Sequence, residues 1–308
     1  MQSKNTKIIQ SPLNYTGGKG KLLNQILPLF PNKINTFVDL FCGGCNVGLN
    51  VNADKVYYND NNKYVIGLFN TLKTLNPNSI LELIYENISK YHLSLVSIHG
   101  YEYYNCNSSD GVGKYNKDKY LKLRYDYNKM EMSDIAYIIL YILIVYAFNN
   151  QIRFNSKGEF NLPVGKRDFN DNMQEKLNSF IKKIKKQDCV FSNKDFRDFN
   201  TKRLSKNDLV YVDPPYLITC ATYNENGGWT TDDEKDLLGF LDNLNDKKIH
   251  FALSNVIKNK GKTNMILENW LKRNPKYKIS HLDYNYANSN YHTKDKDKLC
   301  EEVLITNY

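Results

Sequence analysis

The sequence predicts an α/β protein with a mostly parallel β-sheet and a mainly helical segment inserted into it. From residue 36 onwards, short β-branched or aromatic runs alternate with segments of helical periodicity. Between about residues 77 and 169 this alternation gives way to helices and a Tyr- and Lys-rich stretch. The chain has 308 residues, enough for a large core and a smaller inserted module.

The strands expected in the sheet are short and apolar. They are residues 36–41, 55–58, 189–192, 209–212, 249–253 and 302–306. The expected helices are residues 19–29, 61–75, 170–186, 231–244 and 264–272. Because parallel strands need crossover connections, this order indicates a sheet covered by helices on both faces.

The inserted segment has features of its own. Residues 135–148 form the longest apolar run, which predicts a buried helix begun by Ser133 or Asp134 and too short to cross a bilayer. The Asn155-Ser-Lys-Gly158 turn between two apolar-containing arms predicts a β-hairpin. Residues 105–119, rich in Ser, Asp, Gly and Asn, are expected to form a loop.

Charge and cysteine usage exclude some classes of protein. The formal net charge of +9 is spread along the chain, which is compatible with a surface that attracts a polyanion or with ordinary solvated lysines. Cys42 and Cys45 resemble half of a redox or zinc site, but no second pair or nearby His follows, so we reject that interpretation. The scattered cysteines and the absence of a signal-peptide pattern predict a cytoplasmic protein.

A Gly-rich turn provides the first sign of a ligand. The apolar strand that begins at Thr36 continues as TFVDLFCGGCNVG, so that a turn and a helix follow it. Glycines allow a ligand to approach the backbone beside a helix N-terminus, and Asp60 ends the next expected strand, where it can accept hydrogen bonds from ribose hydroxyls. The spacing G-x-G-x-x-G is absent. The turn and Asp60 together favour an adenosine cofactor without pyrophosphate over a plain tight connection.

A second Gly cluster lies upstream, with the sequence PLNYTGGKGKLL over residues 12–23. The Walker spacing requires Gly where Tyr15 stands and Ser or Thr after Lys21, so ATP hydrolysis is not expected. The cluster opens the expected helix from residue 19. Its functional interpretation is that Tyr15 and Lys19 close over a cofactor carboxylate.

The strongest motif is an apolar strand that ends at Asp213-Pro214-Pro215-Tyr216. Two prolines fix an extended backbone, which holds the Asp213 side chain and the Pro214 carbonyl rigidly. Two acceptors can then converge on one exocyclic amine, and the adjacent aromatic ring offers a face on which a flat base can stack.

Taken together, these motifs resemble the Dam-type (D12 class, α-group) DNA adenine-N6 methyltransferases. The resemblance runs essentially end to end and includes the hairpin segment that begins at Arg153 and the closing EEVLITNY sequence. It implies a Rossmann-like methyltransferase fold with a mostly parallel seven-stranded sheet and an inserted, mainly helical DNA-recognition domain with a β-hairpin. Residues 1–76 and 170–308 are then the catalytic domain, and residues 77–169 the target-recognition domain.

The resemblance also implies which residues bind the cofactor, S-adenosyl-L-methionine, and which act on the base. The cofactor-binding set is Tyr15, Lys19, Asp39, Phe41, Gly43, Gly44, Asp60, Asp195, Phe196 and Asp213. Asp213 and the Pro214 carbonyl accept hydrogen bonds from the N6 amine of a flipped adenine, and Tyr216 stacks on the base. Methyl transfer is then a direct in-line displacement that needs no metal or covalent nucleophile.

DNA recognition is implied for the inserted segment. Phe148 would enter the base stack where adenine leaves it and Asn149 would meet the orphaned partner base; the alternative for Phe148 is a core aromatic that ends the apolar helix. Gln151, Arg153 and Pro163 lie on the hairpin, where Arg is suited to guanine O6 and N7. Lys296 and Lys298, with Lys294, are expected at phosphates or as solvated residues.

The family's best-known target is GATC, which Arg153 and Pro163 match. Two positions depart from the pattern. Asn14 stands where a Lys is usual before the aromatic residue of the first motif, and Gln151 replaces an apolar residue. Another short palindrome such as CATG therefore stays open.

Other functions also stay open. The nearest are methyltransferases of cytosine N4 or of a glutamine side chain, which commonly carry Ser or Asn in place of Asp213, and an enzyme acting on RNA adenine. A DNA-binding regulator that has kept the fold without the reaction is a further alternative. Double-stranded DNA is the expected partner, with a restriction endonuclease of the same site as another candidate, in a prokaryotic or viral setting.

Overall fold

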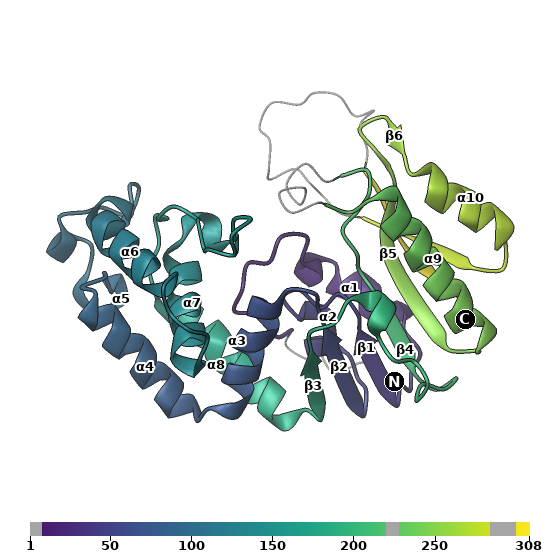
Figure 1. Cartoon of the computed structure of the whole chain (residues 1–308), viewed down its shortest axis with the longest axis horizontal. Coiled ribbons are helices and arrows are strands. Elements are labelled where there is room, and N and C mark those ends of the chain that lie inside the picture. The colour runs from purple at the N-terminus through teal and green to yellow at the C-terminus, as the bar shows by residue number, and fades with distance from the viewer. Residues whose placement is uncertain (1–7, 220–227, 284–299) are drawn as a thin grey trace. The chain divides into compact units, whose positions relative to one another are not determined.

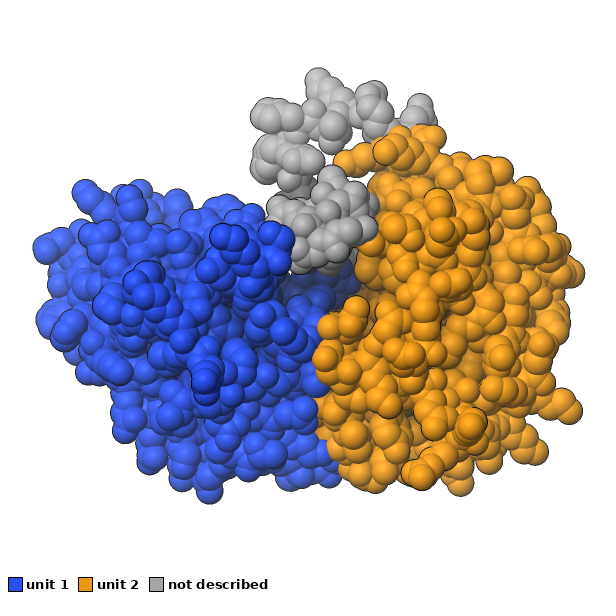
Figure 2. All heavy atoms as spheres, in the orientation of Figure 1, with its two compact units in different colours: residues 1–18, 62–187 blue, residues 19–61, 188–308 orange. Residues whose placement is uncertain are grey.

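The structure, a computed structural model, describes residues 8–219, 228–283 and 300–308. Its internal contacts divide the chain into two compact units, coloured separately in Figure 2. The first unit takes in residues 1–18 and 62–187 and is helical. The second takes in residues 19–61 and 188–308 and contains the sheet.

The sheet unit is built on a mostly parallel sheet, as the sequence predicted (Figure 1). In spatial order its strands are β3 (Cys189–Ser192), β2 (Lys55–Asn59), β1 (Thr36–Asp39), β4 (Leu209–Val212), β5 (His250–Asn259), β8 (Glu301–Thr306) and β7 (Lys278–Leu282). Neighbours from β3 to β5 are parallel, whereas β8 runs antiparallel to both β5 and β7. The short β6 (Lys262–Thr263) pairs with β5 outside this order.

Three strands differ from expectation: β5 is longer than predicted, and β6 and β7 were not predicted. β5 continues to Asn259 instead of ending at residue 253, because its far half pairs with β8 around a bulge between Val256 and Lys258 and then with β6. Most side chains of β7 are exposed or half-buried, so it lacks the apolar run by which buried strands are recognised.

Helices cover both faces of the sheet. On one face α9 (Thr231–Asp246) and α10 (Met265–Arg273) pack on alternate strand residues, and Leu241 and Trp270 lie in this core. On the other face Phe37 and Tyr211 stack, and Phe30 packs on both rings. Alternate residues of each strand point to opposite faces, so both faces of these strands are apolar.

The segment before β1 differs from the single helix predicted over residues 19–29. It consists of the short elements η1 (Lys19–Lys21), α1 (Leu23–Ile26) and η2 (Leu27–Leu29). Pro28 lacks a backbone N–H and occupies the first turn of η2, so a continuous α-helix cannot pass through it. After β1 the chain makes a tight turn and enters α2 (Asn46–Asn50).

The helical unit is organised around one buried helix. Its elements are α3 (Lys63–Thr74), α4 (Pro77–Lys90), α5 (Val96–His99), η3 (Glu102–Tyr104), α6 (Gly113–Tyr127), α7 (Asp134–Tyr146), η4 (Phe148–Asn150) and α8 (Asp171–Lys186). As predicted, α7 is buried, and the side chain of Ser133 caps it by accepting a hydrogen bond from Ala136 N. α3, α4 and α6 all pack against α7. In the parts of the chain that the structure describes, no helix is long and apolar enough to span a membrane.

Two sequence-based boundaries change in this unit. Residues 105–119 are not all loop, because α6 begins at Gly113. This helix was not predicted, since its sequence is rich in Lys and Tyr and the buried side formed by Tyr120, Leu123 and Tyr127 gives no clear apolar period. The unit also takes in residues 62–76 and 170–187, since α3 packs on α7 and α8 packs on α3. The division into catalytic and recognition domains is a functional prediction, and contacts alone do not test it.

Gly48 in α2 provides a test of this packing. A Cβ atom there would lie 2.3 Å from the Tyr58 ring, which is fully buried and stacked on Phe191. We expect Gly48→Ala to lower the unfolding free energy by about 1 to 3 kcal/mol because the ring cannot move aside. Urea unfolding measures the change.

The control is Gly239, which lies in α9 with nothing within 4 Å of an added Cβ. Gly239→Ala should raise stability by roughly 0.5 to 1 kcal/mol, because Ala has the higher helix propensity. Equal stability of Gly48→Ala and the wild type would contradict the close packing of α2 on β2.

Candidate active site

The sequence motifs meet at one edge of the sheet. β1, β2, β3 and β4 are parallel neighbours, so their C-terminal ends lie together. The strand order reverses between β1 and β4, and ligands of open α/β sheets bind at such a switch point. The Gly-rich turn follows β1, Asp60 follows β2, Asp195 follows β3 and Asp213 follows β4.

The Gly-rich turn is held to the end of β2. Cys42 N donates to Asn59 O at 2.8 Å, and Gly43 N donates to the Asp60 carboxylate at 2.8 Å. Gly43 has a φ of 45°, which a residue with a side chain rarely adopts. The carboxylate predicted to hold a ribose is therefore fixed against the turn predicted to pack on the same ligand.

Asp39 lies beneath this turn. Its side chain is 2% exposed and accepts a hydrogen bond from Gly48 N at 3.1 Å, so it links β1 to α2. Burial raises the pKa of Asp39 to about 8, and the charges of Asp213 and Asp60 add to the effect. This residue was predicted to belong to the cofactor-binding set, and its contact in the structure is with the helix that follows the turn.

Asp213 lies beside a buried cation. Lys19 Nζ is 2.8 Å from Asp213 Oδ1, and the lysine is 5% exposed while the aspartate side chain is 15% exposed. Burial raises the pKa of Asp213, and Lys19 acts in the opposite direction. Lys19 was predicted to contact a cofactor carboxylate, but here its ammonium pairs with the acid of the Asp-Pro-Pro-Tyr motif.

Tyr216 completes the motif. Its hydroxyl donates to Asp213 Oδ1 at 3.0 Å, and the Lys19 ammonium lies 4.9 Å from the centre of its ring. Pro214 between them is buried and Pro215 is half-buried. The aromatic ring predicted to stack on a base is thus tied through its hydroxyl to the acid predicted to hold the amine.

Glu302 belongs to the same cluster and was given no role by the sequence. It lies on β8 and is 4% exposed; its Oε1 is 3.1 Å from the Tyr216 hydroxyl and 3.6 Å from Lys19 Nζ. Burial raises the pKa of Glu302. The available signal was an acid in the apolar closing strand EEVLIT, which a sequence alone cannot place beside β4.

An aromatic cluster lies at the ends of β1 and β3. The 3-10 turn η5 (Phe196–Asp198) buries Phe196, whose ring centroid is 5.6 Å from that of Phe41 and 5.8 Å from that of Trp229. Both Phe41 and Phe196 were predicted to contact a cofactor. Trp229 donates from its indole nitrogen to Glu234 at 2.6 Å, which fixes the indole ring to α9.

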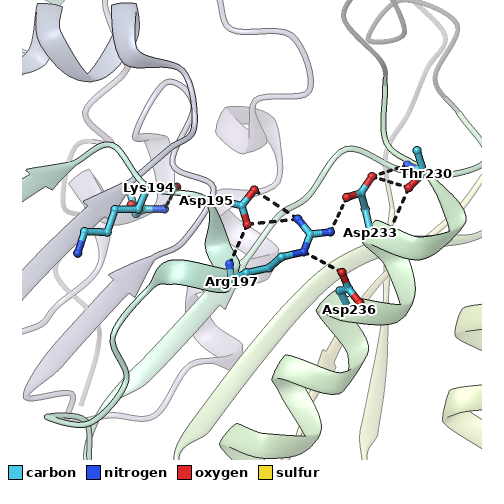
Figure 3. A network of polar contacts seen from close by, with 7 residues as sticks. Lys194, Asp195, Arg197, Thr230, Asp233 and Asp236 are labelled. Carbon is cyan, nitrogen blue, oxygen red and sulfur yellow. Dashed lines mark hydrogen bonds and ion pairs between the residues drawn. The ribbon is translucent and has the colours of Figure 1, made fainter.

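Arg197 fixes the same turn from outside. Figure 3 shows its guanidinium between Asp195 and the two α9 carboxylates of Asp233 and Asp236. Asp195 Oδ1 also accepts from Arg197 N at 2.9 Å. Asp195, which was predicted to belong to the cofactor-binding set, is therefore engaged by Arg197.

The residues of the inserted segment that were predicted to bind DNA lie at the end of α7 and beyond it, within the helical unit. Phe148 is 51% exposed, so it is not a core aromatic, and the following Asn149 has a φ of 54°. Asn14 Nδ2 donates to Asn149 O at 2.8 Å. The residue at the unusual position of the first motif therefore supports the exposed turn that carries Phe148.

The hairpin carries Arg153 on its exposed side. Phe154 and Phe160 form an antiparallel β-bridge. The ring of Phe154 stacks on that of Tyr64, with 3.8 Å between the ring centroids. Arg153 Nε donates to Asn161 Oδ1 at 2.8 Å. Gln151 is half-buried and Pro163 is exposed.

The remaining predicted residues are the lysines before the last strand and Tyr15 of the first motif. Lys294, Lys296 and Lys298 lie outside the described residues. Tyr15 is half-buried, and its carbonyl accepts from Gly18 N in the turn before Lys19.

The cysteine pair has no metal-binding environment. Burial raises the pKa of Cys45 to about 11 and that of Cys42 well above its ordinary value, so both thiols stay protonated. Within residues 8–219, 228–283 and 300–308, no group of three or more His, Cys, Asp or Glu side chains could hold a metal ion.

The order of the strands in the sheet, with a mostly parallel arrangement, is consistent with a Rossmann-like methyltransferase fold. Residues 15–288 match the family described as D12 class N6 adenine-specific DNA methyltransferase. The chain belongs to this family of DNA methyltransferases.

Named relatives support this membership. The chain is 42% identical to the modification methylase StsI of Streptococcus sanguinis and 42% identical to the type II methyltransferase M.FokI of Planomicrobium okeanokoites. Each alignment covers 99% of this chain but only 44% of the relative, so the chain spans less than half the length of these proteins. A DNA adenine methylase of Haemophilus influenzae is 31% identical over 70% of this chain and 67% of its own length.

The raised pKa of Asp39 predicts a dependence of stability on pH. Between about pH 4 and pH 8 the folded protein keeps a proton that the unfolded chain releases, so the unfolding free energy falls as pH rises and levels off above pH 8. Asp39→Asn keeps an oxygen for Gly48 N and has no charge to desolvate. The unfolding free energy of Asp39→Asn should therefore rise relative to that of the wild type by up to about 1.4 kcal/mol for each pH unit between about pH 4 and pH 8.

Urea unfolding at a series of pH values measures this difference. The control is Asp54→Asn, because Asp54 is exposed before β2 and its exchange should leave the wild-type curve unchanged. Parallel curves for the wild type and Asp39→Asn would show that Asp39 is ionised in the folded protein.

Proposed function

We propose that this protein transfers a methyl group from S-adenosyl-L-methionine to N6 of an adenine flipped out of duplex DNA. The observation that carries the proposal is the position of Asp213-Pro-Pro-Tyr216 at the end of β4, next to the Gly-rich turn that follows β1. Members of the matched family methylate adenine at N6 in DNA, which is the reaction this site is suited to.

Asp213 is suited to hold the amine. Lys19 Nζ and the Tyr216 hydroxyl both contact Oδ1 of its carboxylate, which fixes the orientation of the group. The carboxylate would accept a hydrogen bond from an exocyclic amine, together with the rigid Pro214 carbonyl. Two acceptors on one amine draw its lone pair out of conjugation with the ring, and they do so without reorganisation.

The residues at this edge fit S-adenosyl-L-methionine. Asp60 and the backbone of the Gly-rich turn would hold the ribose side, and the aromatic cluster of Phe41 and Phe196 offers apolar surface for the adenine. When bound, the cofactor supplies an electrophilic methyl group on a sulfonium. Asp213 then receives the proton that N6 loses after transfer, which its raised pKa favours.

Asp213→Ala should abolish methyl transfer, with a loss of at least about 100-fold, because the amine loses its acceptor. Binding of S-adenosyl-L-methionine should be largely unchanged. Transfer of a radiolabelled methyl group to duplex DNA and calorimetric titration with the cofactor measure the two effects. The control is Asp54→Ala, an exposed residue before β2; undiminished methylation by Asp213→Ala would overturn the site.

We propose that the hairpin and the turn at Phe148 contact DNA. The exposure of Phe148 and Arg153, and the hydrogen bond from Arg153 Nε to Asn161, support a role on the outside of the unit. A second, longer hydrogen bond from Arg153 Nη2 to Asn161 O at 3.4 Å holds the exposed guanidinium on the hairpin, and a base edge would bind it there. Lys296 and Lys298 stay predicted phosphate contacts.

Arg153→Ala should relax sequence preference at one base pair next to the target, by roughly 1 to 3 kcal/mol. Cofactor binding should stay the same. Methylation rates on a set of duplexes with single base-pair changes measure the effect, and Arg203→Ala, which removes an exposed arginine from the sheet unit, is the control. Unaltered discrimination at every position would refute the role of the hairpin.

The target is proposed as a short duplex site. The relatives give no support to GATC, because the 42% identical proteins are modification methylases while the DNA adenine methylases are 25 to 31% identical. The names of the former favour a role in restriction-modification in the cytoplasm, with a cognate endonuclease as partner. Sequencing of DNA methylation in a host before and after expression tests base, site and substrate together; an unchanged adenine methylation pattern would contradict the proposal.

A further inference from the structure

Glu302 is a buried acid that the transfer step described above does not use. On β8 it pairs in register with Val256 of β5, and its side chain turns towards the cluster at the end of β4. It is 4% exposed. A carboxylate buried to this degree is costly unless partners compensate it, so its partners indicate what it does.

Those partners are shared with Asp213. One ammonium, that of Lys19, serves both acids, at 2.8 Å from Asp213 Oδ1 and 3.6 Å from Glu302 Oε1. One hydroxyl, that of Tyr216, lies 3.0 Å from Asp213 and 3.1 Å from Glu302. A phenol carries a single hydrogen, so it donates to only one of the two carboxylates at a time.

We propose that Glu302 is a positioning residue that sets the proton affinity and orientation of Asp213 through Tyr216 and Lys19. By accepting the Tyr216 hydrogen and drawing on the Lys19 charge, Glu302 leaves Asp213 a stronger acceptor for the amine. It also holds the ring of Tyr216 from the side of β8. This inference rests on the proposed function of Asp213 as the amine acceptor.

The pKa shifts of the two acids have the direction that this inference requires. Burial raises the pKa of both acids, and the charge of Asp213 raises that of Glu302 further. Among the described residues, Tyr211, whose hydroxyl is bonded to Ser254, and Asp39 also interact electrostatically with these acids. Replacing Glu302 by neutral Gln removes a like charge, removes an anionic competitor for Lys19 and leaves only a neutral amide oxygen to compete for the Tyr216 hydrogen. All three changes lower the proton affinity of Asp213.

The first test measures Asp213 directly and needs no substrate. Protein labelled with ¹³C at aspartate carboxyl carbons is titrated by NMR, and the signal of Asp213 is assigned from its loss in Asp213→Asn. In Glu302→Gln the titration midpoint of Asp213 should lie lower than in the wild type, by about one pH unit. The control is Glu301→Gln on the same strand, since Glu301 faces His281 at 3.6 Å, and it should leave the midpoint unchanged.

The second test follows methyl transfer in a single turnover with saturating cofactor and DNA. Glu302→Gln should slow transfer by about 10- to 100-fold with affinities for cofactor and DNA unchanged, and the acidic limb of the pH-rate profile should move to lower pH. Tyr216→Phe keeps the aromatic ring and removes the hydroxyl that contacts both Asp213 and Glu302. If Glu302 acts through this hydroxyl, the double variant is no slower than the slower single variant.

The outcomes separate the inference from the proposed function. An unchanged or raised midpoint of Asp213 in Glu302→Gln overturns the inference, as does a double variant whose two losses multiply. A wild type that methylates no adenine in duplex DNA contradicts the proposed function, and the carboxyl titration still decides whether Glu302 controls Asp213. A lowered midpoint together with slower transfer at unchanged affinity supports both.

Discussion

The site depends on one buried cation placed between a buried acid, Glu302, and a half-buried acid, Asp213. Lys19 contacts Asp213 and lies close to Glu302, and Tyr216 bridges the same two carboxylates. Moving an isolated carboxylate out of water costs several kcal/mol, so neither acid could stay ionised here without the other members. Each of the three elements that meet at the cluster, η1, the end of β4 and β8, is therefore needed for the properties of Asp213.

A second constraint is the small space beneath the Gly-rich turn. Asp39 accepts from Gly48 N, and the Tyr58 ring leaves no room for a side chain at that position. The turn itself is held to the end of β2 through Asp60. The backbone of the Gly-rich turn, which a ligand at this edge would contact, is therefore held in position by α2 and by the end of β2.

Much of the sheet unit could be predicted because its signals are local. β3 and β4 coincide with the apolar runs from which they were predicted. α9 begins at Thr231, directly after the capping residue Thr230. Edge strand β7 and the amphipathic helix α6 were not recognised, since their apolar positions are too few or too dispersed to produce a clear period. The break of the first helix at Pro28 was a readable signal that the prediction did not use.

The sequence by itself determined the fold class, the order of the motifs and the chemistry expected of Asp213-Pro-Pro-Tyr216, because strand periodicity and proline geometry act over a few residues. Tertiary structure alone decided that Lys19 pairs with Asp213 and that Glu302 joins them. These residues lie far apart in the sequence. The approach of Glu302 to Asp213 follows from the pairing of β5 with β4 and β8 in the sheet, and η1 brings Lys19 to the same place; no local pattern records these contacts.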